Sequence, residues 1–130
     1  MASLGDRSFV FSGKSSDSEG SEAALFEIMK TSIDSEHVSG LKFIKQLEDS
    51  SVSQYTVIPL QSLNGFLTIG GANDSAHMLD TCSFVSLDST KTDLEIPKSK
   101  YLRKQACSAV FGDHATSNKI YVYIFGGTKT

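Results

Sequence analysis

A short apolar strand that ends in glycine recurs along this chain at a nearly constant interval. The fullest example lies near the C-terminus, where Ile120 to Phe125 are followed by Gly126 and Gly127. The pattern returns at positions 65–71, and a shorter form occurs at positions 8–13. The last glycines stand at 13, 71 and 127, so the two intervals are 71 − 13 = 58 and 127 − 71 = 56. Because self-similarity at a fixed period is the signature of repeat architectures, this spacing constrains the fold more than any other feature.

The residue types in these stretches indicate how the repeated element folds. Aromatic and branched aliphatic side chains in an unbroken run are typical of a strand that is buried on both faces. Glycine adopts positive φ at little cost and lets another backbone approach closely, so paired glycines predict a tight bend after each strand. The glycines that mark the repeat are Gly13, Gly70, Gly71, Gly126 and Gly127.

The composition is that of one globular domain. The chain has 130 residues, of which 39% are hydrophobic and 21% charged. Its net charge is −3, whereas a nucleic-acid-binding surface requires concentrated Lys and Arg, so we expect no nucleic-acid partner. The densest basic stretch is Lys98 to Lys104, which we interpret as a solvated connection rather than an anion site.

The sequence carries neither a membrane span nor a secretion signal. No stretch approaches the roughly 18 apolar residues of a span, and residues 1–7 lack the basic start and apolar centre of a signal peptide. We therefore expect a cytoplasmic protein without a membrane partner. Cys82 and Cys107 each lie in an apolar run, and we expect two small buried side chains in a reducing compartment. A disulfide is the alternative, and it requires that the two strands be neighbours.

Short apolar runs separated by polar turns fill the stretches between the glycines. Residues 23–30 contain good helix formers, but a strand fits the repeated pattern better. The polar segment 31–40 is predicted to be a turn. The predicted strands are residues 8–11, 23–30, 41–47, 54–60, 66–70, 81–87, 93–96, 105–111 and 120–125.

Asn64 and Gly65 form the strongest hairpin signal in the chain, because this dipeptide is favoured in tight turns between paired strands. Residues 54–60 and 66–70 flank it, so we predict that they pair as an antiparallel hairpin. Each glycine-to-glycine interval then holds four short strands, and four antiparallel strands in about 40–50 residues form one blade of a β-propeller. An unrelated all-β sandwich is the alternative that this pattern leaves open.

Residues 66–127 resemble the kelch repeat. Phe66 to Gly71 match its strand that ends in two glycines, and Phe84 to Asp88 match its strand that ends in an aromatic–Asp pair, with leucine in place of the aromatic. Leu94 stands where the family has tryptophan, and Pro97 matches the proline of the following connection. The chain contains no tryptophan, and its first copy departs furthest from the pattern.

The resemblance implies an all-β fold: an incomplete kelch-type β-propeller built from four-stranded antiparallel blades. Residues 1–53 are then a degenerate partial blade, residues 54–104 a kelch-like blade, and residues 105–130 the first two strands of a further blade. A ring closes with about 4–8 blades. The terminal blade faces and edges should therefore be apolar and uncovered. The chain is then a fragment of a longer propeller, or it assembles with copies of itself or a partner through the exposed edges, or it is marginally folded.

Kelch-like propellers present loops from several blades as a recognition surface, so the resemblance implies a protein-interaction module that acts as a scaffold or recognition surface for a protein partner. The polar and aromatic residues that could serve in such loops are Asp74, His77, Tyr101, Arg103, Asp113 and His114. The three histidines show no metal-site spacing, so we expect no metal, no cofactor and no catalytic residues. The alternative is a fragment of a kelch-like propeller enzyme, of the oxidase or isomerase type.

Overall fold

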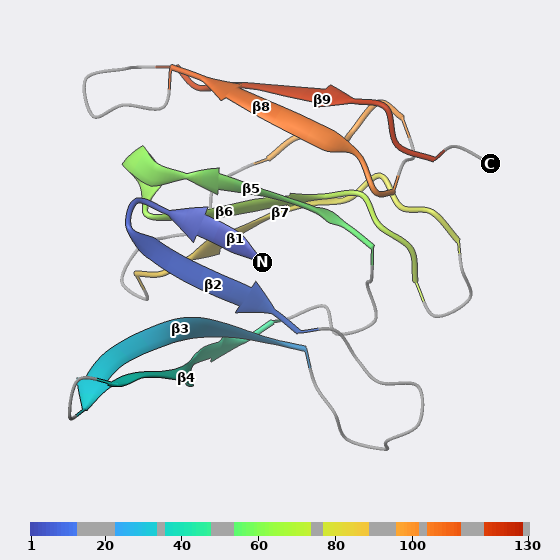
Figure 1. Ribbon diagram of the computed structural model, residues 1–130. Helices are drawn as coiled ribbons and strands as arrows, with labels where there is room; N and C mark the ends of the chain where they lie inside the picture. The colour runs from blue at the N-terminus through green and yellow to red at the C-terminus, as the bar shows by residue number, and fades with distance from the viewer. Residues whose placement is uncertain are drawn as a thin grey trace. The chain divides into compact units, whose positions relative to one another are not determined.

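The computed structural model of this chain is all-β, and the strand pairings in its described part are antiparallel (Figure 1). The residues that the structure describes are 1–12, 23–33, 36–47, 54–73, 77–88, 96–101, 104–112 and 119–128. The chain divides into two compact units, Met1–Ser50 and Ser51–Thr130. The predicted all-β fold is therefore confirmed, while the predicted blade boundaries stay predictions.

The first unit contains a four-stranded sheet with the order β1-β2-β3-β4. Its strands are β1 (Ala2–Leu4), β2 (Arg7–Phe11), β3 (Ala24–Ile33) and β4 (Glu36–Gln46). The strand predicted at 23–30 is confirmed. Strand β1 was not predicted, because so short a segment of ordinary composition gives no periodic signal. It pairs with β2 across a tight turn, in which Gly5 has φ 63°.

The prediction of a turn over residues 31–40 is wrong. β3 continues to Ile33 and β4 already begins at Glu36, with Ile33 paired to Glu36. A β-ladder is made by backbone N–H and C=O groups, so a polar composition does not end it while the partner strand continues. The two strands therefore form one long hairpin rather than two short strands joined by a polar connection.

The second unit contains a three-stranded sheet of order β5-β6-β7 and a two-stranded sheet of β8 and β9. The strands are β5 (Thr56–Leu60), β6 (Gly65–Ile69), β7 (Cys82–Ser86), β8 (Cys107–Phe111) and β9 (Tyr121–Phe125). The strands predicted at 81–87, 105–111 and 120–125 are thus confirmed. Of the strand predicted at 93–96, residues 93–95 lie outside the described residues.

The predicted hairpin of residues 54–60 and 66–70 is confirmed, but its turn is longer than the dipeptide suggested. Leu60 pairs with Gly65, so four residues lie between the strands. Gln61–Leu63 form a short 3-10 helix (η1), and Asn64 follows it with φ 48° and donates its N–H to the carbonyl of Gln61. Asn64 thus supplies the left-handed conformation that ends this turn, because asparagine tolerates it better than most residues.

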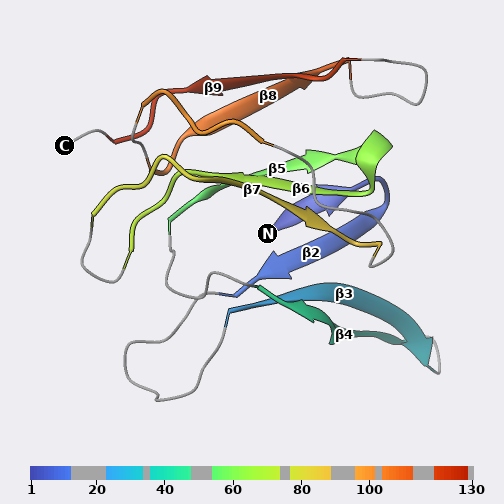
Figure 2. The same ribbon diagram turned by 180° about the vertical axis from the view of Figure 1, so that it is seen from behind.

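The core of the second unit lies between its two sheets. Figure 2 shows the β8–β9 hairpin as a second layer over the β5–β7 sheet. Four buried aliphatic side chains of β5 and β6 face this hairpin: Ile58, Leu60, Leu67 and Ile69. The hairpin side chains that pack against them are Val110, Ile120, Val122 and Ile124. Each fully buried aliphatic side chain contributes about 1.5–3 kcal/mol, so this interface stabilises the unit substantially.

Candidate interaction surface

The two sheets of the second unit correspond in backbone conformation as well as in sequence. Gln54 stands two residues before β5, Gln105 stands two residues before β8, and both have left-handed φ, of 58° and 54°. The N–H of Gln105 donates to the carbonyl of Gln54 at 3.1 Å. Beside them, the Thr56 hydroxyl donates to the Ala106 carbonyl at 3.1 Å and accepts from the Ala106 N–H at 3.2 Å. Corresponding residues therefore meet where β5 and β8 begin.

The glycines that mark the repeat have the expected conformation where the structure describes them. Gly70 and Gly71 have φ 68° and 103°, and Gly126 and Gly127 have φ 64° and 88°. A Cβ on Gly127 would lie 2.9 Å from the Lys104 carbonyl oxygen, so here a second backbone does approach closely. Gly13 lies outside the described residues.

These glycines set the correspondence between β6 and β9. The first residues of the two strands are separated by 121 − 65 = 56 in the numbering, which equals the interval between their glycines. Tyr123 therefore corresponds to Leu67, and Phe125 corresponds to Ile69. Leu67 and Ile69 are 8% and 5% exposed, whereas Tyr123 and Phe125 are 52% and 57% exposed. The same face of the repeat is thus covered in the first sheet and open in the second.

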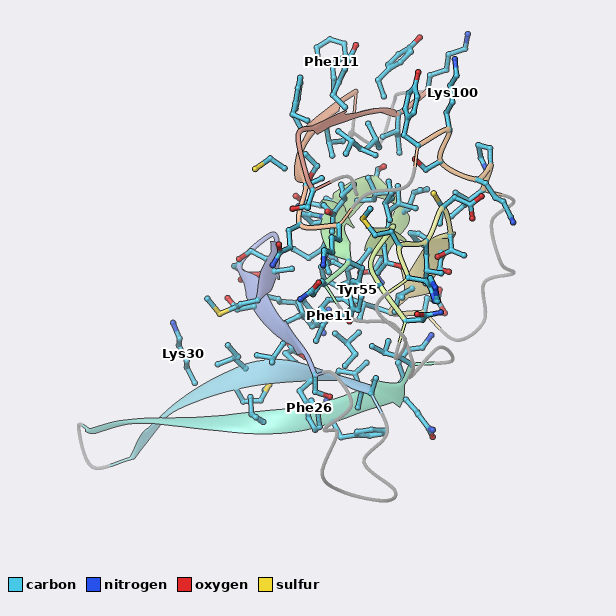
Figure 3. All side chains as sticks on the ribbon, turned by 90° about the vertical axis from the view of Figure 1, so that its right-hand side faces the viewer. Phe11, Phe26, Lys30, Tyr55, Lys100 and Phe111 are labelled. Atoms are coloured by element: carbon cyan, nitrogen blue, oxygen red, sulfur yellow. The ribbon has the colours of Figure 1, made fainter. Side chains whose placement is uncertain are left out.

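The open face of the β8–β9 hairpin carries a cluster of aromatic side chains, which we call the aromatic face. Figure 3 shows Phe111 on the side of the hairpin away from the β5–β7 sheet, and Phe111 is 69% exposed. The rings of Tyr123 and Phe125 stack with centroids 6.5 Å apart at an interplanar angle of 15°. The strand residues of this face are Cys107, Ala109, Phe111, Tyr121, Tyr123 and Phe125. None of them is charged, which is unusual for an exposed strand surface.

The prediction that residues 120–125 are buried on both faces is wrong. Val122 and Ile124 face the core, but Tyr121, Tyr123 and Phe125 alternate with them and are exposed. Because the run is apolar throughout, hydrophobicity alone does not show that buried and exposed residues alternate along it. The sequence signal that could have revealed it is the alternation of Tyr with Val and Ile, because Tyr combines an apolar ring with a polar end.

A second exposed apolar surface lies on the β1–β4 sheet, and we call it the N-terminal face. Phe26 pairs with Phe43 across β3 and β4, and their rings meet edge to face with centroids 5.8 Å apart. Ile28 pairs with Leu41 on the same side, and Val10 of β2 pairs with Phe26. Leu41 and Phe43 are 63% and 58% exposed.

The opposite side of the β1–β4 sheet is packed and carries an ion pair. Phe9 and Leu25 are fully buried there. The Arg7 guanidinium donates to both oxygens of the Glu27 carboxylate, at 2.7 and 2.8 Å. These hydrogen bonds, with the charges of Arg7 and Lys42, hold the pKa of Glu27 below its usual value although burial opposes them. The two sides of this sheet therefore differ as clearly as the two sides of the β8–β9 hairpin.

Two of the loop residues predicted from the sequence lie in the described part of the chain. His77 is exposed, and its backbone N–H donates to the Asn73 side-chain oxygen at 3.0 Å. Tyr101 is 50% exposed, and the Lys100 ammonium lies 5.6 Å from the centre of its ring. The predicted loop residues that lie outside the described residues are Asp74, Arg103, Asp113 and His114. The aromatic face was not among the predicted sites.

The two cysteines are free thiols in different environments. Cys82 packs against the core of the second unit, and burial raises the pKa of its thiol. Cys107 is exposed and lies on the aromatic face. The prediction of two buried cysteines is therefore wrong for Cys107, because its face of β8 is not covered.

No family model, curated protein or solved structure matches this chain. In the part of the chain that the structure describes, no group of three or more His, Cys, Asp or Glu residues could hold a metal ion. None of the helices among those residues has both the length and the apolar character needed to cross a membrane.

Proposed function

We propose that this chain is a segment of a kelch-like β-propeller that serves as a protein-interaction module, as a scaffold or a recognition surface. The observation that carries the proposal is the aromatic face. Its four aromatic side chains are between 49% and 69% exposed on one side of a regular hairpin, while the other side of the hairpin is packed into a core. A regular apolar surface of this kind is typical of a protein interface.

The residue types also favour a protein partner. Tyr is enriched at the energetic centres of interfaces, because its large rigid ring provides contact area at a small cost in conformational entropy. Tyr121 and Tyr123 lie beside Phe111 and Phe125, so the surface offers apolar rings together with two phenolic hydroxyls. A protein surface that buries the rings and accepts hydrogen bonds from the hydroxyls fits this arrangement.

Site-specific crosslinking in the native lysate tests the proposal. A photoreactive amino acid replaces Ala109, which is exposed at the centre of the aromatic face, and in a matched control it replaces Ser83, which is exposed on β7. We expect a protein crosslinked at position 109 and not at position 83, identified by mass spectrometry and then shown to bind as a purified protein. Equal crosslinking at the two positions would refute the proposal.

A further inference from the structure

We infer that the aromatic face binds the N-terminal face of a second copy of this chain. The inference deepens the proposed function, on which it rests, because it names the partner. The evidence is the interface between the two sheets of the second unit, together with two exposed faces that correspond to the two sides of that interface.

The interface within the second unit is the template. One side is the face of the β5–β7 sheet that contains Ile58, Leu67 and Ile69, and the other side is the inner face of the hairpin that contains Val122 and Ile124. None of the strand residues that the pairing places on these two sides is charged. The template shows that two successive repeats of this chain associate face to face through apolar side chains.

The aromatic face corresponds to the first side of the template. In the correspondence between β6 and β9, Tyr123 and Phe125 take the positions of Leu67 and Ile69. The strand pairing agrees with this correspondence. Leu67 pairs with Ile58, the third residue of β5, and Tyr123 pairs with Ala109, the third residue of β8. What covers this side in the template is the inner face of a hairpin, so a surface of that kind is the expected occupant.

The N-terminal face corresponds to the second side of the template. The first residues of β2 and β9 are separated by 121 − 7 = 114 in the numbering, which equals the separation of Gly13 and Gly127. Val10 therefore takes the position of Ile124. Around Val10, this face continues with Phe26, Ile28, Leu41 and Phe43, and two of these residues are more than half exposed. One copy thus exposes the receiving side and another copy exposes the inserting side of the same kind of interface.

This pairing makes the contact heterologous, since two different surfaces meet rather than two equal ones. Heterologous contacts close into rings or extend into open assemblies, whereas a contact between two aromatic faces would give a symmetric dimer. The two arrangements respond differently to substitutions, and this difference provides the test.

The experiment uses the full chain with Tyr123→Asp, with Phe43→Asp, or with Ser83→Asp as a control outside both faces. Sedimentation velocity measures the mass over a range of concentrations. We expect the unsubstituted chain and the control to self-associate, and each of the other two variants to be monomeric, because a charge buried at an interface weakens it by about 30-fold or more. An equimolar mixture of Tyr123→Asp and Phe43→Asp should form a dimer, because each variant keeps the face that the other lacks.

Several results would overturn the inference. These are a monomeric unsubstituted chain, a Phe43→Asp variant that still associates, or a mixture that stays monomeric while both variants have the circular dichroism of the unsubstituted chain. The first result together with a different protein crosslinked at position 109 would leave the proposed function standing. The first result with no crosslinked protein would remove both.

Cys107 supplies a second measurement, whose main observation is made on the unsubstituted chain. It lies on the aromatic face and is exposed, so maleimide labels it readily in the monomer. We expect its labelling rate in the unsubstituted chain to fall about tenfold as the protein concentration rises through the range of assembly, and to stay constant in the Phe43→Asp variant. A labelling rate that does not change while the mass increases would show that assembly uses another surface.

Discussion

Strands β6 and β9 each run into a pair of glycines, yet they differ in burial. In β6 only Thr68 is partly exposed, whereas in β9 every second side chain is exposed. Both strands present apolar side chains on the same face, aliphatic in β6 and aromatic in β9. The difference lies in the neighbour, because a packed hairpin covers β6 and no described residue covers that face of β9. The burial of these two strands is therefore set by the neighbouring sheet, not by the strand itself.

The first residues of the two strands also differ, and here the difference follows from the neighbouring strands of the same sheet. Gly65 of β6 corresponds to Tyr121 of β9. β6 has a third strand beside it, and Phe84 and Val85 of that strand leave no room for a Cβ on Gly65. The hairpin has two strands in its sheet, and Tyr121 is 49% exposed. Glycine thus stands where an adjacent strand leaves no room for a side chain, and tyrosine stands in the sheet that has only two strands in the described part of the chain.

The largest effect is expected from Gly65→Ala. The added Cβ would lie 2.5 Å from both the Phe84 ring and the Val85 carbonyl oxygen, so β6 and β7 would have to separate. We expect the free energy of unfolding to fall by about 3 kcal/mol or more, measured by urea denaturation. Gly40→Ala is the matched control within a strand, because no atom of the described residues outside its chain neighbours lies within 4 Å of the place that its added Cβ would take, and it should raise stability by about 0.5–1 kcal/mol. Equal losses in the two variants would contradict the packing described for β6.

Corresponding residues of the two repeats give the next prediction. Leu67→Ala empties a covered position and should cost about 2–4 kcal/mol, whereas Tyr123→Ala changes a side chain that is 52% exposed and should cost less than about 1 kcal/mol. Thermal and urea unfolding of the two variants at a concentration where the chain is monomeric measure the difference. A Tyr123→Ala variant as unstable as Leu67→Ala would mean that the aromatic face is covered in the folded monomer.

The sequence predicted the parts of this fold that depend on local patterns. The strands of the second unit and the hairpin around Asn64 and Gly65 follow from apolar runs and turn residues, and the glycine spacing identified Gly70, Gly71, Gly126 and Gly127 as residues of positive φ. The long β3–β4 hairpin escaped prediction, because its ladder depends on the backbone of a partner strand rather than on side-chain type.

The sequence predicted less of the candidate surface, for a related reason. The run at residues 120–125 is apolar throughout, and residue types alone do not tell whether a face of a strand is covered. Whether a face is covered depends on the neighbouring sheet, and the residue types of the strand do not specify that sheet. The residues proposed from the sequence were polar side chains and one tyrosine in predicted loops, and a choice limited to loops does not include aromatic side chains on a strand.

The comparison of corresponding positions also includes the Arg7–Glu27 ion pair of the β1–β4 sheet. The pairing of the strands places Glu27 opposite Phe9, at the position that Phe84 holds opposite Leu67. Because the pKa of Glu27 is lowered in the folded state, its contribution to stability is fully present above the unfolded pKa of about 4.3 and is lost as pH falls through the lower folded-state pKa. We expect Glu27→Gln to cost about 1 kcal/mol near pH 7 and to remove this part of the acid dependence. Arg7→Gln should remove it as well, and unfolding curves between about pH 2 and 7 measure both effects. An unchanged acid dependence in both variants would show that the pair does not shift the pKa.

The smallest effect is expected where the two repeats begin. Gln105 has φ 54°, a conformation in which an L-residue is strained by about 1 kcal/mol and glycine is not. Gln105→Gly should therefore stabilise the chain by about 0.5 kcal/mol, after the greater flexibility of glycine in the unfolded state is allowed for. Gln46→Gly, at the end of β4, makes the same substitution in an extended strand and should destabilise by a similar amount. Opposite signs in the two variants, measured by urea denaturation, would show that the left-handed residue before β8 is a strained feature of the repeat. A loss of stability in both would mean that the Gln105 side chain contributes more than its backbone conformation costs.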